Sequence, residues 1–287
     1  MQKYSIFNLI KNAFSNHEKW DLAWKDPTPK KEYDVVIIGG GGHGLATAYY
    51  LAKEHNVTNV AIIEKGWIGG GNVGRNTTII RSNYMHDDNA LFSEFGMDLW
   101  RRMSQDLNYN VMFSPRGIIN LAHSDAQMNT FARRGNSMRL NGIDAELLNR
   151  EQVREIIPMA DFSENVRFPI FGGLMQPSAG TARHDAVAWG YARQADSMGV
   201  DIIQNCEVTG FDIANGKING VRTSRGDIKV KKIGLCVAGS TNILAEKLNM
   251  TLPVETHLLQ ACVSEPVKPV LDRVVTFGAG HFYISQS

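Results

Sequence analysis

Residues 33–64 constrain the fold of this chain more than any other part of the sequence. Residues 33–38 form a short apolar run rich in β-branched side chains, which is typical of a strand buried on both faces of a parallel sheet. Glycines follow at once, then a helical segment over 45–55 and a second apolar strand over 59–64. Together these segments predict a βαβ unit, which places the chain in the α/β class.

The glycines between the first strand and the helix match the pattern GxGxxG. Gly39 permits a tight turn, Gly41 lets the backbone approach a pyrophosphate, and Gly44 allows close packing of helix on strand. The amino terminus of the helix offers free N–H groups to phosphates. Glu64 follows Gly44 by 20 residues, where an acid accepts the ribose hydroxyls of an adenosine. A glycine-rich turn without a ligand is the alternative, but the whole pattern favours a dinucleotide.

Residues 66–82 show no helical or strand period over most of their length and are predicted to form a long functional loop. Its hydrogen-bonding side chains are Asn72, Arg75, Asn76, Thr77 and Thr78. Such a loop suits a second contact with an extended cofactor such as FAD, whereas NAD or a merely polar surface loop stays open at this point. An acid at position 64, in place of Arg or Ser, disfavours a 2′-phosphate.

The remaining pattern predicts a second lobe interleaved with the first. Helices are predicted over 89–106, 125–140, 147–157 and 184–198, with Asn149 as a cap. Strands are predicted over 117–123, 201–203, 207–213, 218–223, 227–230, 232–238, 254–264 and 274–285. Residues 1–33 are amphipathic and then broken by Pro27 and Pro29, which indicates an arm leading into the first strand.

Composition excludes several classes of function. A formal net charge of +1 does not give the excess of positive charge that is typical of proteins binding nucleic acid or an anionic membrane surface. The 3 cysteines show no CxxC spacing, so neither a disulfide framework nor a metal site is expected. We therefore expect a cytoplasmic protein with no metal, no membrane and no nucleic acid among its partners.

Three stretches carry a resemblance to a known family. They are VVIIGGGGHGLATAYYLAKEHNVTNVAIIEKGWIGGGNVGRNTTIIRSNY, GTARHDAVAWGYAR and IIQNCEVTGF. They are similar, almost residue for residue, to the β subunit of heterotetrameric sarcosine oxidase, and the resemblance runs from about residue 30 to the end. It implies a D-amino-acid-oxidase-type flavoprotein with a Rossmann-like FAD-binding domain and an interleaved α+β substrate domain.

The resemblance implies a domain plan in this numbering. Residues 34–110 and 180–250 form a discontinuous FAD-binding domain, and residues 111–179 and 251–287 form the substrate domain. Because the family's β subunit is longer, we expect the substrate domain to be incomplete at the C-terminus. The chain alone is then expected not to retain FAD tightly.

Cofactor contacts also carry over from the family. Non-covalent FAD is expected at Gly42, His43, Glu64, Asn72, Thr77, Ile79 and Val208, beside the glycines of the turn. A second flavin, FMN, is expected to be bound covalently to His184, with Arg183 as a positive contact. Asp185 is placed to fix the tautomer of His184.

The activity implied is oxidation of the N-methyl group of sarcosine to give glycine and hydrogen peroxide. The one-carbon unit passes to tetrahydrofolate through the α subunit, with γ and δ subunits completing the heterotetramer. No catalytic acid or base is identified from the sequence. Two alternatives stay open: a stand-alone FAD-dependent dehydrogenase or oxidase of another amine, such as dimethylglycine or glycine, and an inactive scaffold that carries FAD for a partner.

Overall fold

A computed structural model describes residues 5–18, 20, 22–163 and 165–286. Residues 1–4, 19 and 21 of the predicted arm, and residues 164 and 287 of the predicted substrate domain, lie outside the described residues. The chain divides into two compact units. Unit 1 comprises residues up to Asn76, Gln105–Asn110 and His184–Ala261; unit 2 comprises Thr77–Ser104, Val111–Arg183 and the chain from Cys262 onward.

These boundaries differ from the predicted plan in three places. Residues 77–104 and 180–183 belong to unit 2, whereas the plan had placed them in the cofactor domain. The reason is local pairing, because Ile79 lies opposite Thr181 in a short antiparallel ribbon. Residues 251–261 belong to unit 1. The assignment of cofactor binding to one unit and of substrate binding to the other stays a prediction.

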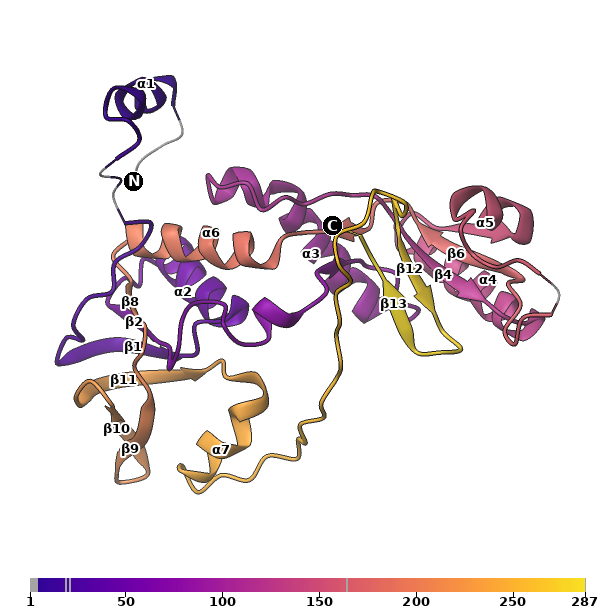
Figure 1. Ribbon diagram of the computed structural model, residues 1–287. Helices are drawn as coiled ribbons and strands as arrows, with labels where there is room; N and C mark the ends of the chain where they lie inside the picture. The colour runs from indigo at the N-terminus through magenta and orange to yellow at the C-terminus, as the bar shows by residue number, and fades with distance from the viewer. Residues whose placement is uncertain (1–4, 19, 21, 164, 287) are drawn as a thin grey trace. The chain divides into compact units, whose positions relative to one another are not determined.

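Unit 1 is built on a sheet of six strands in the order β8-β2-β1-β11-β10-β9 (Figure 1). The strands are β1 (Glu32–Ile38), β2 (Val60–Ile63), β8 (Asp201–Ile203), β9 (Val208–Ala214), β10 (Lys217–Thr223) and β11 (Ile228–Leu235). The first four in that order are parallel, and β10 and β9 are antiparallel. Every residue of β2 is buried, as a central strand of a parallel sheet requires.

One long strand, β11, replaces the two strands predicted over 227–230 and 232–238. Its first residues pair antiparallel with β10, and its length from Lys229 to Leu235 runs parallel to β1. A single strand therefore joins the antiparallel meander to the parallel sheet. The sequence prediction split it because its exposed lysines interrupt the apolar run.

The helices and short helical turns of unit 1 connect or cover this sheet. They are α1 (Ile6–Phe14), α2 (Gly42–His55), η1 (Val73–Arg75), α6 (His184–Ser197), η2 (Ala238–Ser240) and α7 (Thr241–Glu246). Helices α2 and α6 pack on each other, with the Tyr49 and Tyr191 ring centroids 5.4 Å apart. The first βαβ unit is thus confirmed, with α2 beginning three residues earlier than predicted.

Unit 2 contains a five-stranded sheet in the order β13-β12-β4-β6-β5. The strands are β4 (Ile118–Ala122), β5 (Glu146–Asn149), β6 (Gly172–Gln176), β12 (Val274–Phe277) and β13 (Phe282–Ile284). Its helices are α3 (Asp87–Asp106), α4 (Asp125–Leu140) and α5 (Arg150–Ile156), and β3 (Ile79–Ile80) pairs with β7 (Gly180–Thr181). Asn149 caps α5 in a capping box with Gln152, as predicted for this cap.

Two predicted strands are wrong. Residues 254–264 form no strand, and Leu258 and Leu259 are 96% and 94% exposed, because the alternating pattern has no neighbouring strand to pair with. Residues 274–285 form the hairpin β12–β13, since the turn at 278–281 reverses the chain. Within the described ranges, no helix has both the length and the apolar character needed to cross a lipid bilayer.

Candidate functional site

The glycine turn lies at the carboxyl end of β1, at the centre of the unit 1 sheet. Gly39 has a φ of +109°, and a Cβ atom there would lie 2.3 Å from the carbonyl oxygen of Cys236. A Cβ atom on Gly44 would lie 2.0 Å from the carbonyl oxygen of Gly39. These two positions therefore require glycine for the turn and for helix–strand packing, as the sequence predicts.

The outer side of the turn is open. A Cβ atom on Gly41 or Gly42 would meet only a methyl carbon of Val73, at 3.7 and 3.5 Å. Gly41 is the N-cap of α2 and supplies no side-chain cap, so the first amides of the helix keep their hydrogen-bonding capacity. His43, in this first turn, is exposed. Open space beside free helix amides is the geometry that binds a phosphate.

Glu64 follows β2 and reaches back to the glycine turn. Its carboxylate accepts hydrogen bonds from the Gly40 and Gly66 amides, at 2.7 and 2.8 Å. Its carbonyl oxygen accepts from the Cys206 amide at 2.9 Å, two residues before the buried Val208 at the start of β9. The structure thus places Glu64 beside the turn and near Val208, while leaving the carboxylate half-buried.

The predicted loop folds back onto the turn. The Gly69 amide donates to the carbonyl of Gly40 at 3.0 Å, and the Gly74 amide donates to the carbonyl of Gly69 at 2.9 Å. The Arg75 guanidinium donates to the carbonyls of Gly70 and Gly71. Asn72 is exposed just before the short helical turn η1. This loop therefore frames the open side of the glycine turn within unit 1.

The residues of unit 1 fit an adenine dinucleotide. The amides of α2 suit the pyrophosphate, the glycines leave room for it, and Glu64 suits the ribose hydroxyls. The backbone amides of Gly40 and Gly66 hold the carboxylate of Glu64 at the rim of the turn.

Thr77 and Ile79 belong to unit 2, where they flank a strained residue. Thr78 is β-branched and has a φ of +59°, a conformation that costs about 1–3 kcal/mol. Its carbonyl accepts from the Ala182 amide at 3.2 Å. The Thr77 hydroxyl donates to the Tyr283 hydroxyl at 2.8 Å, and Ile79 pairs with Thr181. Strained backbone of this kind is concentrated at functional sites.

Arg183 and His184 are adjacent at the start of α6. Arg183 is exposed, and its amide donates to the carbonyl of Val111 at 3.0 Å. His184 is half-buried and is the first residue of the helix. Asp185 accepts a hydrogen bond from the Ala186 amide at 2.8 Å. The imidazole therefore lies at a helix start, beside a basic side chain that reaches solvent.

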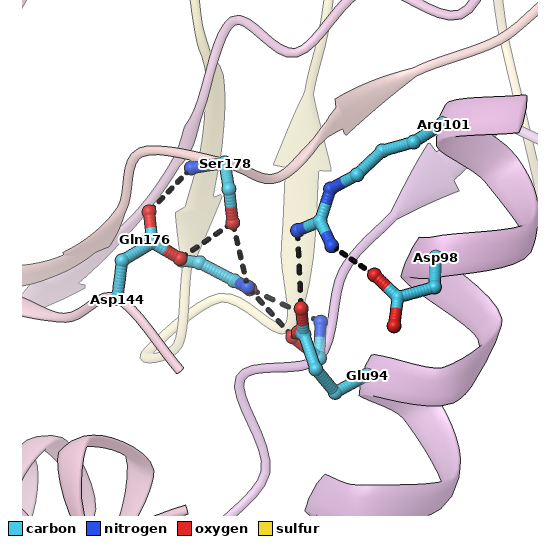
Figure 2. A network of polar contacts seen from close by, with 7 residues as sticks. Glu94, Asp98, Arg101, Asp144, Gln176 and Ser178 are labelled. Atoms are coloured by element: carbon cyan, nitrogen blue, oxygen red, sulfur yellow. Dashed lines mark hydrogen bonds and ion pairs between the residues drawn. The ribbon is translucent and has the colours of Figure 1, made fainter. Parts of the chain in front are cut away.

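A polar network that the sequence did not reveal supports the segment carrying Thr77 and Ile79. Gln176, fully buried at the end of β6, accepts from the Ser82 amide at 3.1 Å and donates to the Ser82 hydroxyl at 2.7 Å. Figure 2 shows this network extending to Asp144 through Ser178, and to Arg101 through Glu94. The sequence shows only a glutamine at the end of an apolar strand. That pattern identifies no hydrogen-bond partner until the fold brings Ser82 beside Gln176.

Two guanidinium groups near this network were also missed. Arg134 donates to the carbonyl of Asn83, and Arg81 donates to the side chain of Asn83 while stacking on Tyr84, 4.7 Å from the ring centroid. Burial, with repulsion from Arg81, lowers the pKa of Arg134 to about 10. Neither group has an ion pair among the described residues. The pair forms a positive, partly buried patch suited to an anion.

Comparison with known proteins gives consistent matches. A model of the family "FAD dependent oxidoreductase" matches residues 34–287. The chain is 59% identical to sarcosine oxidase subunit beta of Rhizobium meliloti strain 1021, over 99% of this chain and 68% of that protein. It is 50% identical to the protein of the same name from Rhodobacter capsulatus, over 100% of this chain and 69% of that protein.

A solved structure with the same fold is L-proline dehydrogenase from P. horikoshii. It aligns with a TM-score of 0.78 and 25% identity, over 90% of this chain and 68% of that one. The chain therefore spans about two thirds of the length of each of these three proteins.

Proposed function

Because the chain belongs to the FAD-dependent oxidoreductase family, and within it to the β subunits of sarcosine oxidase, we propose that it holds FAD and oxidises sarcosine. Dioxygen is the final acceptor of the two electrons removed from sarcosine and becomes hydrogen peroxide, glycine is the other product, and the one-carbon unit is passed to tetrahydrofolate on the α subunit. The enzyme is a cytoplasmic heterotetramer with α, γ and δ subunits. The observation that carries the proposal is the open glycine turn with Glu64 at its rim.

Each part of the unit 1 site has one task in this proposal. FAD, when bound, supplies the two-electron oxidation of the substrate amine. The amides at the start of α2 hold the pyrophosphate, and Gly41 and Gly42 leave space for it. The Gly40 and Gly66 amides hold the Glu64 carboxylate at the rim of the turn, where its oxygens can also accept from the ribose hydroxyls. Asn72 and His43 border the same open side as exposed polar groups.

Arg81 has a side chain that fits the carboxylate of an amino acid substrate. One terminal nitrogen bonds Asn83 and the planar group rests on Tyr84, which leaves further N–H donors free for a carboxylate. The neighbouring Arg134 adds a positive charge without reaching a carboxylate of its own among the described residues. Binding of the substrate carboxylate relieves the repulsion between the two guanidinium groups.

His184 is the proposed attachment point of covalent FMN. Attachment to a flavin needs a nitrogen nucleophile, and the half-buried imidazole of His184 offers a ring nitrogen at the start of α6. Arg183 gives a positive charge for the flavin phosphate. Mass spectrometry of the chain co-expressed with its neighbouring subunits should find the His184 peptide carrying the mass of FMN. An unmodified peptide in an active, assembled enzyme would remove this part of the proposal.

The activity is tested by anaerobic titration of the purified complex. We expect sarcosine to bleach the flavin absorbance, and dimethylglycine, glycine and proline to do so at least 10-fold less effectively. The Arg81→Ala variant should raise the sarcosine concentration needed by about 100-fold, since a charged hydrogen-bonded pair contributes roughly 3 kcal/mol. Bleaching by dimethylglycine or glycine alone identifies an oxidase of another amine. No bleaching by any amine identifies a scaffold subunit.

A further inference from the structure

Helix α1 has an apolar face that the described residues leave exposed. Ile6, Phe7, Leu9, Ile10 and Phe14 lie on one side of the helix and are 46–88% exposed. No residue of this nine-residue helix is buried. The Ser5 side chain caps its start by accepting from the Asn8 amide at 3.2 Å. A helix of this length is marginal in water, so an unpaired apolar face calls for a partner surface.

The segment that follows α1 is fastened to unit 1. The Asp26 carboxylate accepts from the Gln204 amide and forms an ion pair with Arg225, both at 3.0 Å. The Lys25 amide donates to the Asp196 carboxylate at 3.0 Å. Ten residues separate the end of α1 from this anchor, a contour length of about 35 Å. The arm is therefore fixed at its base while its helix presents an apolar side to solvent.

The arm lies outside the fold that the family shares. The family model begins at residue 34, so the anchored segment and α1 both precede it. The alignments with the two proteins named as β subunits nevertheless cover 99% and 100% of this chain and so include the arm. A segment that precedes the matched oxidoreductase fold, and that the alignments with these two subunits include, is suited to assembly.

Charge argues against a membrane as the occupant. Each basic residue contributes about 1 kcal/mol to binding an anionic bilayer, and α1 carries only Lys11. A second copy of the helix is also disfavoured, because two nine-residue helices are too short to pair stably on their own. An apolar groove on another polypeptide can instead accept Phe7, Ile10 and Phe14, which have the i, i+3, i+7 spacing of anchors in helix–groove recognition.

We propose that α1 is a docking helix whose apolar face inserts into an apolar groove on a different subunit of the same enzyme. This inference rests on the proposed function as a β subunit, and it specifies how that subunit holds its partner. The polar side of the helix, with Lys11 and Asn12, stays at the rim of the groove. Docking orders the helix, and the anchor at Asp26 limits how far the partner lies from unit 1.

The test uses the full chain co-expressed with the other subunits. The triple variant Phe7→Ala, Ile10→Ala, Phe14→Ala should weaken binding of the partner subunit by at least 10-fold, measured by light scattering after gel filtration over a dilution series. The matched control, Lys11→Ala with Asn12→Ala, alters the other side of the same helix and should assemble as the unchanged chain does. Compared with the unchanged chain in the same unassembled state, both variants should bind added FAD with unchanged affinity, because the glycine turn is untouched.

The outcomes separate the two proposals. If the unchanged chain assembles and the triple variant assembles equally tightly, the docking helix is rejected while the β-subunit function stands. If the unchanged chain assembles with no other subunit, the proposed function itself fails. Binding of the unchanged chain, but not of the triple variant, to vesicles of one third anionic lipid would overturn the proposal in favour of a membrane surface.

Discussion

At the scale of single residues, the glycines of the turn have two different tasks. Gly44 serves the fold, since an added Cβ atom there would overlap the Gly39 carbonyl at 2.0 Å. Gly41 has ordinary backbone angles and room for a methyl group, so its role is to leave space for a ligand. The same motif therefore contains a position that folding requires and one that only binding requires.

Because of this difference, one of two matched substitutions should affect mainly the stability of the fold and the other mainly the binding of FAD. Gly44→Ala should lower the free energy of unfolding by about 3 kcal/mol, because the helix must move away from the strand. Gly41→Ala should change it by less than about 0.5 kcal/mol and yet weaken FAD binding at least 10-fold. Urea unfolding of the apoprotein and fluorescence titration with FAD measure the two quantities. Equal losses of stability in both variants would contradict the division of tasks.

At the scale of elements, the first βαβ unit could be predicted because all its signals are local. The apolar period, the glycine spacing and the terminal acid lie within residues 33–64 and need no distant partner. Strand β6 was missed because Gly172 and Gly173 weaken its pattern, although it lies between β4 and β5. Residues 254–264 show the opposite error, a strand pattern without a neighbouring strand.

The candidate site likewise contains some contacts that local sequence patterns predict and others that they do not. Gly39 and Glu64 could be placed beside each other from the sequence alone, because the two strands that precede them are adjacent in a parallel sheet. The hydrogen bonds between Gln176 and Ser82 join residues 94 positions apart. No local pattern encodes such a contact. Arg81 stacks on the nearby Tyr84, but their segment has no helical or strand period from which the stacking could be predicted.

The contact of Gln176 with Ser82 yields a prediction for the elements that it joins. Gln176→Leu removes the acceptor of the Ser82 amide and the donor to its hydroxyl in a fully buried place. The free energy of unfolding should fall by about 2 kcal/mol, and limited proteolysis should cut the chain faster within residues 77–84. Ser178→Ala is the control, since it removes the hydroxyl bonds to Asp144 and Gln176 but leaves both hydrogen bonds between Gln176 and Ser82 in place. Loss of equal size in both variants would show that the buried pair does not position the segment.

At the scale of the whole molecule, the response to alkaline pH depends on tyrosines buried in unit 1. Burial raises the pKa of Tyr33, Tyr49 and Tyr191 above the ordinary value of 10.0. Above pH 10 the unfolded chain therefore loses protons that the folded chain keeps, and the free energy of unfolding falls as the pH rises. Below pH 10 this contribution to stability is fully present. In unit 2, the lowered pKa of Arg134 acts with the opposite sign above about pH 10.

A difference between variants isolates the tyrosine contribution from that of Arg134. Each tyrosine that stays protonated only in the folded chain contributes a fall of up to about 1.4 kcal/mol per pH unit. Tyr191→Phe should therefore make the decline of unfolding free energy between pH 10 and 11.5 shallower, as urea unfolding at a series of pH values would show. Tyr283→Phe is the matched control, because the residue Tyr283 is 47% exposed, and this variant should keep the steeper decline of the unchanged chain. If Tyr191→Phe declines as steeply as the control, ionisation of this buried hydroxyl does not limit the alkaline stability of the molecule.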